Sequence, residues 1–258
     1  MNEMQFTQKS IVAVLLFLMF SVYSVRAQGI LERLKQAIEQ KKSVSDSTAS
    51  KSASLQGISS NEMSSALKQA LNLGVSEGIE KLGAEDGFFK NELVKIMLPE
   101  QLRKVDGTLR SIGLSSLADR GLLLLNRAAE DAVTEGAPIF AKAITSMTFD
   151  DAKNILLGDS TAATAYLKVK TSDQLFVAFK PKVQNSLGKV GADKVWEQLI
   201  SKYNTIARQD ITTDLNEYVT QETINGVFTM VAEKESNIRN NAVFRTTSLL
   251  KKVFGAVD

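Results

Sequence analysis

Four consecutive leucines, Leu122–Leu125, stand in the middle of the stretch 119–133. Successive residues of an α-helix are 100° apart, so four neighbours point to every side of it. A helix that is apolar on all sides has to be surrounded by other elements. The pattern therefore predicts a central leucine-rich helix around which the rest of the domain is wrapped.

A second apolar pattern, with intervals of three and four residues, precedes this helix and predicts another one. Ser59 and Glu62 have the spacing of a capping box at its start, and Gly83 stops it. Gly74 and Gly78 lie four residues apart and would let a neighbouring helix approach closely. The apolar stripe consists of Met63, Leu67, Leu71, Val75, Ile79 and Leu82.

The remaining elements follow from turn and cap signals. Residues 87–98 are expected to be extended, and Pro99 suits the start of the next helix. Gly136 and Pro138 interrupt the pattern, and Pro181 should bend a later helix. The segment 174–180 could alternate as a strand, but its continuation at helical period favours a helix. The anchors expected in the extended segment are Phe88, Phe89, Leu93, Ile96 and Leu98.

Further capping signals divide the second half of the chain into separate helices. Thr148 and Asp151 have the spacing of a cap, which places Asp150 and Asp151 at a helix start. Thr171 and Gln174 fit another cap, which separates a helix ending near residue 169 from the next one. The prediction is an all-α, single, bundle-like domain of about nine or ten helices, with no strand.

The N-terminal region differs in composition from this domain. Residues 1–27 combine Lys9, an apolar run and small residues before Ala27, which is typical of a signal peptide. The alternative is a retained anchor helix, but the run is short for a membrane span. Residues 28–42 form a short amphipathic helix candidate, residues 43–60 a serine-rich linker, and residues 61–258 the helical domain.

Composition narrows the possible functions. Without residues 1–27, Lys and Arg fall from 31 to 29 and Asp and Glu from 29 to 28, so the net charge falls from +2 to +1. That balance argues against a nucleic-acid-binding protein. The chain has no Cys and no His, which excludes disulfides, thiol nucleophiles, Ser-His-Asp triads and His- or Cys-ligated metals. No cofactor is expected.

A candidate polar site lies on the central helix. Asn126 and Glu130 fall on the same side of the helical wheel as Leu122 and Leu123, so a covered face carries an amide and a carboxylate. Such groups need partners when buried. Three arginines could supply them: Arg120, Arg127 and Arg239.

Two interpretations of these residues are open. In the first, they line a pocket in which Glu130 binds a ligand or transfers protons. In the second, the helix emerges into solvent after Leu125, or the polar groups form a structural hydrogen-bond network.

Three other charged or catalytic-looking segments have ordinary explanations. Ser65-Ala-Leu-Lys68 matches the Ser-x-x-Lys pattern of penicillin-recognising enzymes but lacks the companion Lys-Thr-Gly. The stretch 233–239 has ion-pair spacings typical of a solvated helix face. The terminal helix carries Arg245, Lys251 and Lys252 beside apolar residues, so it could touch an anionic membrane, although packing against the domain is the favoured interpretation.

Many short motifs resemble the bacterial family called domain of unknown function 4197, over roughly residues 63–254. Met97 and Asn241-Ala242 depart from that pattern. The resemblance implies an exported bacterial helical protein and assigns no activity. The motifs are Asp86-Gly-Phe88, Asn126-Arg-Ala-Ala-Glu130, Pro138-Ile-Phe140, Met147-Thr-Phe-Asp-Asp-Ala-Lys153, Ile155-Leu-Leu-Gly-Asp159, Ala162-Ala-Thr164, Tyr218-Val-Thr220, Asn225-Gly-Val-Phe228, Ala232-Glu233, Ile238-Arg239 and Leu249-Leu-Lys-Lys-Val-Phe254.

The leading hypothesis is therefore a non-enzymatic binding or interaction protein of the bacterial cell envelope. It would be periplasmic, or secreted if the host lacks an outer membrane, with no lasting membrane contact after signal cleavage. One alternative is a carrier of lipid or another apolar ligand. The other is a carboxylate-dependent hydrolase centred on Glu130, which would need a second acid facing it across a cleft.

Overall fold

The computed structural model describes residues 55–189, 191–208 and 214–257, and residues from 55 onward form one compact unit. The predicted signal peptide, the predicted amphipathic helix 28–42 and most of the predicted serine-rich linker lie outside the described residues. Within the described part every regular element is helical, which confirms the all-α prediction. No helix there is long and apolar enough to span a membrane.

The first described helix, α2 (Ser60–Gly83), follows its sequence pattern closely. Ser59 Oγ accepts a hydrogen bond from the Glu62 amide, and the Glu62 carboxylate accepts one from the Ser59 amide, so the capping box is complete. A Cβ on Gly74 or Gly78 would meet Lys234 or Met230 of α9, so these glycines admit a close neighbour as predicted. The whole predicted stripe is buried: Met63, Leu67, Leu71, Val75, Ile79 and Leu82.

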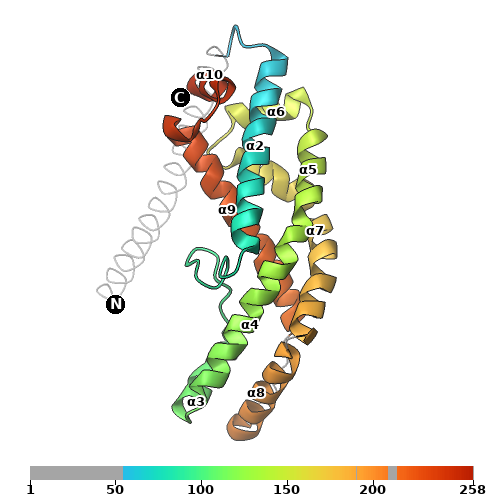
Figure 1. Ribbon diagram of the computed structural model, residues 1–258, viewed down its shortest axis with the longest axis vertical. Coiled ribbons are helices and arrows are strands. Elements are labelled where there is room, and N and C mark those ends of the chain that lie inside the picture. The colour runs from blue at the N-terminus through green and yellow to red at the C-terminus, as the bar shows by residue number, and fades with distance from the viewer. Residues whose placement is uncertain (1–54, 190, 209–213, 258) are drawn as a thin grey trace, which may run out of the picture. The chain divides into compact units, whose positions relative to one another are not determined.

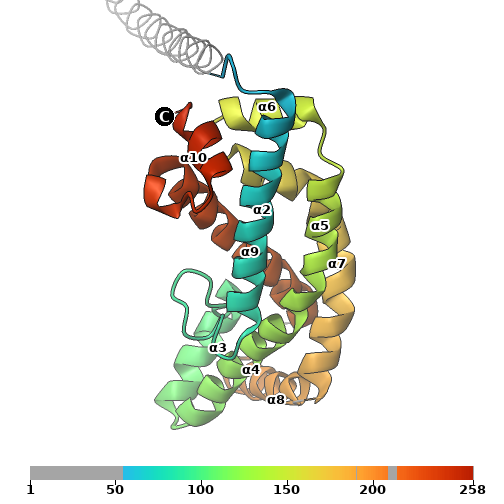
Figure 2. The ribbon, with the colours of Figure 1, turned by 45° about the horizontal axis from the view of Figure 1, so that its top comes forward.

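Helices α4, α5, α6, α9 and α10 pack against α2, and α7 packs against α4 and α9 (Figures 1 and 2). Helices α3 and α8 lie at one end, and α6 and α10 at the other. The elements are α3 (Glu100–Ser111), α4 (Ser115–Val133), η1 (Thr134–Gly136), α5 (Ala137–Thr145), α6 (Phe149–Leu157), α7 (Ala162–Lys189), α8 (Ala192–Ala207), α9 (Leu215–Asn240), η2 (Ala242–Phe244) and α10 (Ser248–Gly255).

The leucine-rich helix is α4, and it contacts α2, α3, α7, α8 and α9. Its position is central, as predicted, but the leucine run is not covered on every side. Leu125 is fully buried, whereas Leu122, Leu123 and Leu124 are only half-buried. The neighbouring helices do not enclose this half of α4 completely. The most buried part follows the run, at Ala128, Ala129, Ala132 and Val133.

The predicted helix break at Thr171 is wrong, because α7 is continuous through it. Thr171 is buried, and its hydroxyl donates a hydrogen bond to the Leu167 carbonyl at 2.7 Å. A threonine inside a helix can bond to the carbonyl four residues earlier instead of capping a new helix. Pro181 lies inside the same helix. The interruption predicted at Gly136 and Pro138 is confirmed by η1 and the start of α5.

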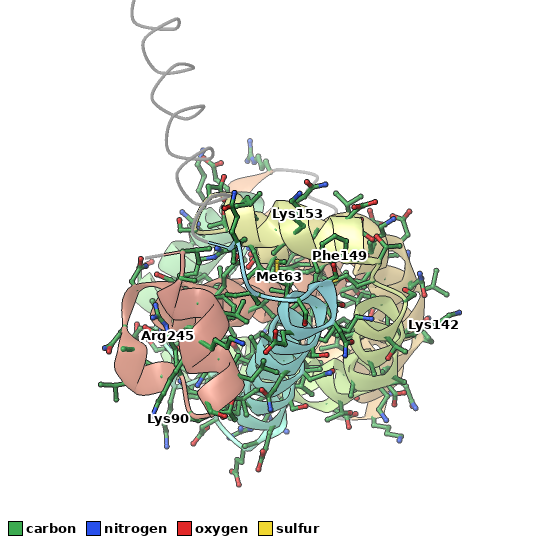
Figure 3. All side chains as sticks on the ribbon, turned by 90° about the horizontal axis from the view of Figure 1, so that it is seen from above. Met63, Lys90, Lys142, Phe149, Lys153 and Arg245 are labelled. Carbon is green, nitrogen blue, oxygen red and sulfur yellow. The ribbon has the colours of Figure 1, made fainter. Side chains whose placement is uncertain are left out.

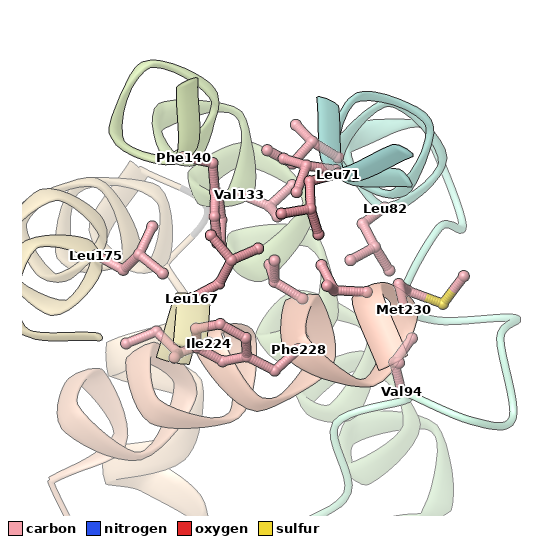
Figure 4. Close-up of a cluster of buried hydrophobic side chains, with 14 of the residues drawn as sticks. Leu71, Leu82, Val94, Val133, Phe140, Leu167, Leu175, Ile224, Phe228 and Met230 are labelled. Atoms are coloured by element: carbon pink, nitrogen blue, oxygen red, sulfur yellow. The ribbon is translucent and has the colours of Figure 1, made fainter. Parts of the chain in front are cut away.

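The core fills the space between α2, α4, α5, α7 and α9 (Figure 4). Phe140 from α5 and Phe228 from α9 meet edge to face, with ring centroids 5.9 Å apart. That geometry adds a favourable quadrupole interaction to the burial of apolar area. Charged side chains such as Lys90 and Lys142 point outward, while Met63 lies toward the middle (Figure 3).

Helix α10 packs its apolar side onto the domain, as the favoured interpretation predicted. Leu250, Val253 and Phe254 are buried. Arg245, expected on the basic outer side, is buried instead, and its guanidinium donates to the carbonyls of Ile238 and Arg239. This arginine holds the end of α9 to the segment that leads into α10.

Candidate functional site: a buried polar network beneath the α2–α3 connection

The site begins with a sharp turn after α2. Asp86 has a positive φ of 65°, and the Gly87 amide donates to the Ala84 carbonyl. A Cβ on Gly87 would lie only 2.3 Å from the Lys81 carbonyl oxygen, so no larger residue fits against the last turn of α2. The Asp86-Gly87 pair therefore turns the chain back across α4.

The turn directs two successive amides at the carboxylate of Glu130. Phe88 N–H and Phe89 N–H both donate to Glu130 Oε1, each at 3.1 Å. Glu130 Oε2 accepts from Arg127 Nη1 at 2.6 Å. The Glu130 side chain is only 5 % exposed, so both of its oxygens are committed to bonds inside the protein.

Arg127 joins this carboxylate to the turn itself. Its Nη2 lies 2.7 Å from Asp86 Oδ1 and 3.3 Å from Glu85 Oε1. Lys90 contacts the other oxygen of Asp86 at 2.7 Å. These cations, Lys90 first and then Arg127, hold the pKa of Asp86 below its usual range. The guanidinium is thus shared between a buried acid on α4 and an acid of the turn.

Asn126 anchors the far end of the same connection. It is completely buried, and its side chain bonds to the Ile96 backbone in both directions. Asn126 Oδ1 accepts from Ile96 N–H at 2.8 Å, and Nδ2 donates to Ile96 O at 2.9 Å. Nδ2 also donates to the Leu122 carbonyl at 2.9 Å. The amide therefore pairs with Ile96 as a neighbouring β-strand would.

Helix α9 holds the other side of the connection. The fully buried ring of Phe88 lies over Gly226, where a Cβ would come within 2.6 Å of it. The Tyr218 hydroxyl donates to the Met97 carbonyl at 2.8 Å. We call residues 84–99 the anchored loop, because polar groups of α4 and a glycine of α9 fix it along its length.

The anchored loop differs in part from its prediction. Residues 95–99 have no regular structure, but residues 84–94 are mostly turns and not an extended segment. Leu93, an expected anchor, is 64 % exposed, and Val94 is buried in its place. The cause is a turn in which the Val94 amide donates to the Asn91 carbonyl.

Two of the five predicted site residues lie elsewhere. Arg120 is exposed on α4, about 15 Å along the helix from Glu130 at 1.5 Å per residue. The proposed pairing of Arg239 with this site is wrong, because Arg239 binds Glu235 within α9 at 2.9 Å. The structure brings Asn126, Arg127 and Glu130 together beneath the anchored loop.

Glu235 belongs to a second buried network, which sequence reasoning missed. The stretch 233–239 was expected to be solvated, yet Glu235 and Arg239 are almost fully covered. Glu235 accepts from the amides of Ala163 and Thr164, at 2.9 and 2.8 Å. It thereby accepts from amides in the first turn of α7, which have no partner within the helix. The missed signal was the position of Glu235, four residues after Val231 and three before Ile238, which are both buried.

The arrangement of the first network suits it to anchor the loop to α4. Every oxygen of Glu130 and every polar atom of Asn126 has a bonding partner within the chain. Asp86 is bound to the same guanidinium as Glu130, so the two acids do not face each other across an open cleft. No cluster of three or more carboxylates suited to a metal ion occurs among residues that the structure describes.

Two small cavities lie along the contact of α2 with α9, away from this network. One has room for about 20 Å³ and is bordered by Leu71, Glu235 and Phe254. The other has about 60 Å³ and is bordered by Glu77, Lys234 and Phe244. Spaces of this size hold one to a few water molecules.

The fold and the network together define an all-α protein in which buried polar side chains position a loop. The chain belongs to the family described as "Protein of unknown function (DUF4197)", whose model matches residues 57–255. That assignment confirms the resemblance expected from the motifs. Comparisons with curated proteins and with solved structures found no match.

Proposed function

We propose that this chain is a non-enzymatic interaction protein of the bacterial cell envelope, exported by its N-terminal segment, and that the anchored loop is its partner-binding element. The observation that carries the proposal is the exposure of two large apolar side chains on a loop whose backbone is tied to the core. Leu93 is 64 % exposed and Met97 52 % exposed.

The anchoring gives those side chains a fixed presentation. Loops positioned by a rigid scaffold commonly carry binding residues. A loop that is ordered before it binds also loses less conformational entropy on association. Asn126 lies beneath the end of the loop that bears Met97, and Glu130 beneath its first turn. The two buried polar groups would then serve binding indirectly, as positioning residues.

The Lys95 ammonium group lies 4.8 Å from the centre of the half-buried Phe89 ring. The exposed surface of the anchored loop thus combines apolar side chains with a cation over an aromatic ring and with the exposed acids Glu85 and Glu92. An apolar centre with a polar rim of both charges suits a protein partner.

The two alternative functions find less support. A hydrolase centred on Glu130 requires a carboxylate that is free to act on a substrate, and this one bonds two amides and an arginine. A carrier of lipid requires a pocket of several hundred Å³. Among the residues that the structure describes, the two cavities along the contact of α2 with α9 offer about 20 and 60 Å³, well below that size.

The proposal is tested by site-specific photo-crosslinking in the native bacterium. A photoreactive amino acid at position 93 or 97 should capture the same protein repeatedly, and the captured chain should begin after the predicted signal peptide. Lys153, exposed on α6, serves as the control position (Figure 3). Capture of no recurrent protein at 93 and 97 beyond the control would refute the partner-binding role.

A matched variant separates recognition from folding. Leu93→Ser with Met97→Ser changes only exposed side chains, so the far-UV circular dichroism and the thermal midpoint should stay unchanged. Crosslinking from a neighbouring loop position should nevertheless fall at least tenfold. Unreduced crosslinking in this variant would count against the two apolar side chains as contact residues.

A further inference from the structure

The outward face of α7 carries an exposed apolar pattern that neither buried network explains. Helix α7 buries Leu167, Leu175 and Phe179 against the bundle. On the opposite side, Val169 is 84 % and Val177 is 74 % exposed. The two valines are eight residues apart, so they lie on one face with Asp173 midway between them.

Two aromatic side chains, Tyr166 and Phe176, lie on the same face, and each is followed by a lysine four residues later. Lys170 Nζ lies 5.7 Å from the Tyr166 ring centre, and Lys180 Nζ lies 5.3 Å from the Phe176 ring centre. Both rings are only half-buried. We call this face the α7 ridge; its members are Tyr166, Val169, Lys170, Asp173, Phe176, Val177 and Lys180.

We propose that the α7 ridge pairs with the α7 ridge of a second copy of this chain, antiparallel, around a two-fold axis at Asp173. In such a pair, a residue a given number of positions before Asp173 meets the residue of the second copy that lies the same number of positions after its own Asp173. Val169 then meets Val177 of the second copy, four residues from the axis on each side. Lys170 meets Phe176, and Tyr166 meets Lys180.

The sequence of the ridge is complementary to itself in this direction. Each ammonium group already lies beside a ring of its own chain, and Lys180 also contacts Glu217 at 3.5 Å. In the antiparallel pair each ammonium group would also face a ring of the second copy, which is a favourable cation–π arrangement. A parallel pair would set Lys170 against Lys170 and Lys180 against Lys180, which is repulsive. The two Asp173 carboxylates meet at the axis, and the Lys170 ammonium groups, one helical turn away, offset their repulsion.

The same residues argue against an anionic lipid surface as the occupant. A membrane would meet the Asp173 carboxylate at the centre of the ridge. Valine, a short β-branched side chain, also suits close helix–helix packing better than insertion among lipid headgroups. The ridge is accessible, because Val169 and Val177 are largely exposed, and α7 lies at the outside of the bundle in both ribbon views (Figures 1 and 2).

The pair should be weak. A contact made by one helix from each partner is at the small end of protein interfaces, below about 1,200 Å² of total buried surface. We therefore expect a concentration-dependent dimer. Disulfide trapping is well suited to it, because the chain contains no Cys and every thiol is one that has been introduced.

The test uses single cysteine variants of the full chain under mild oxidation. Asp173→Cys lies on the proposed axis and should form a disulfide-linked homodimer rapidly. A mixture of Val169→Cys and Val177→Cys should give the mixed dimer at least tenfold faster than Val169→Cys gives its homodimer. In the antiparallel pair the two copies of position 169 lie about 12 Å apart along the axis, too far for a disulfide. Val243→Cys, on the exposed η2 segment, is the control for random collision.

Sedimentation velocity of the unmodified chain supplies the second measurement. The wild type should shift toward a dimer with rising concentration, and Val169→Lys with Val177→Lys should remain monomeric with unchanged circular dichroism. A monomeric wild type together with Asp173→Cys trapping no faster than Val243→Cys would overturn the proposal. So would a dimer that survives the double lysine substitution, or equal trapping of the mixed and unmixed cysteine variants.

Discussion

Removal of the Glu130 carboxylate provides the sharpest test of the anchored loop. Glu130→Ala leaves the buried Phe88 amide without an acceptor and leaves the part-buried Phe89 amide to bond with water instead. It also removes the carboxylate partner of Arg127 Nη1. A buried unsatisfied amide costs about 1–3 kcal/mol, and a hydrogen bond to a charged group contributes about 1.5–3 kcal/mol. Arg127 is 29 % exposed and keeps Asp86, so its own penalty is small. We expect a total loss of about 3–5 kcal/mol, the range found when one partner of a buried pair is removed.

Urea unfolding followed by circular dichroism measures that loss, and hydrogen exchange locates it. The amides of Phe88 and Phe89 should lose protection more than those of α9. Glu130→Gln retains an acceptor oxygen but turns a donor toward Arg127, so it should cost less than Glu130→Ala. Glu135→Gln, at a half-exposed ion pair with Lys182, is the matched control and should change stability by less than about 1 kcal/mol. If Glu130→Ala cost no more than this control, or left both amides protected, the anchoring role would be wrong.

Three further substitutions test other contacts. Asn126→Asp removes both N–H donors of the side-chain amide and sets a carboxylate against the Ile96 carbonyl. The free energy of unfolding should therefore fall by about 2–4 kcal/mol, and hydrogen exchange at the Ile96 amide should become faster. Unchanged exchange at that amide would contradict this expectation. Gly226→Ala pushes a methyl group into the Phe88 ring and should cost about 1–3 kcal/mol in urea unfolding, whereas a neutral result would show that the ring can move aside. Glu62 has its pKa lowered to about 2, first by its bond with Lys252. Because the folded pKa lies below the unfolded one, this contribution is full above about pH 4.5 and is lost as the pH falls toward 2. Glu62→Gln should therefore flatten the dependence of the thermal midpoint on pH in that window, and an unchanged slope would remove Glu62 from the acid response.

The fold was largely predictable because local signals agreed with one another along the chain. The apolar stripe of α2, its capping box at Ser59 and its closing glycine all indicated one helix, and the structure has it. The Thr148–Asp151 cap predicted the start of α6 in the same way. The Thr171 signal failed because a threonine hydroxyl can bond either to a new helix start or to its own helix, and the buried side of α7 favoured the second.

The candidate site was predictable in part. Asn126 and Glu130 share a face of the helical wheel with Leu122 and Leu123, so their need for partners followed from the sequence. Arg127 was within reach as a residue of the same helix, three positions before Glu130. The carboxylate of Glu130 and the side-chain oxygen of Asn126 also accept from backbone amides, those of Phe88, Phe89 and Ile96. These amides lie 30 or more residues away, and no side-chain pattern in the sequence indicates them.

The sequence by itself determined the helices, because helix formation depends on periodicity, caps and breakers within a few residues of each other. It also excluded every site that needs Cys or His. The tertiary structure alone decided which groups bind each buried carboxylate, and it alone showed that Glu235 is buried. Glu130 and Glu235 each lie where the amides of another segment converge on the side chain. Burial of a charge depends on neighbours distant in the chain, and only the packed helices bring those neighbours together.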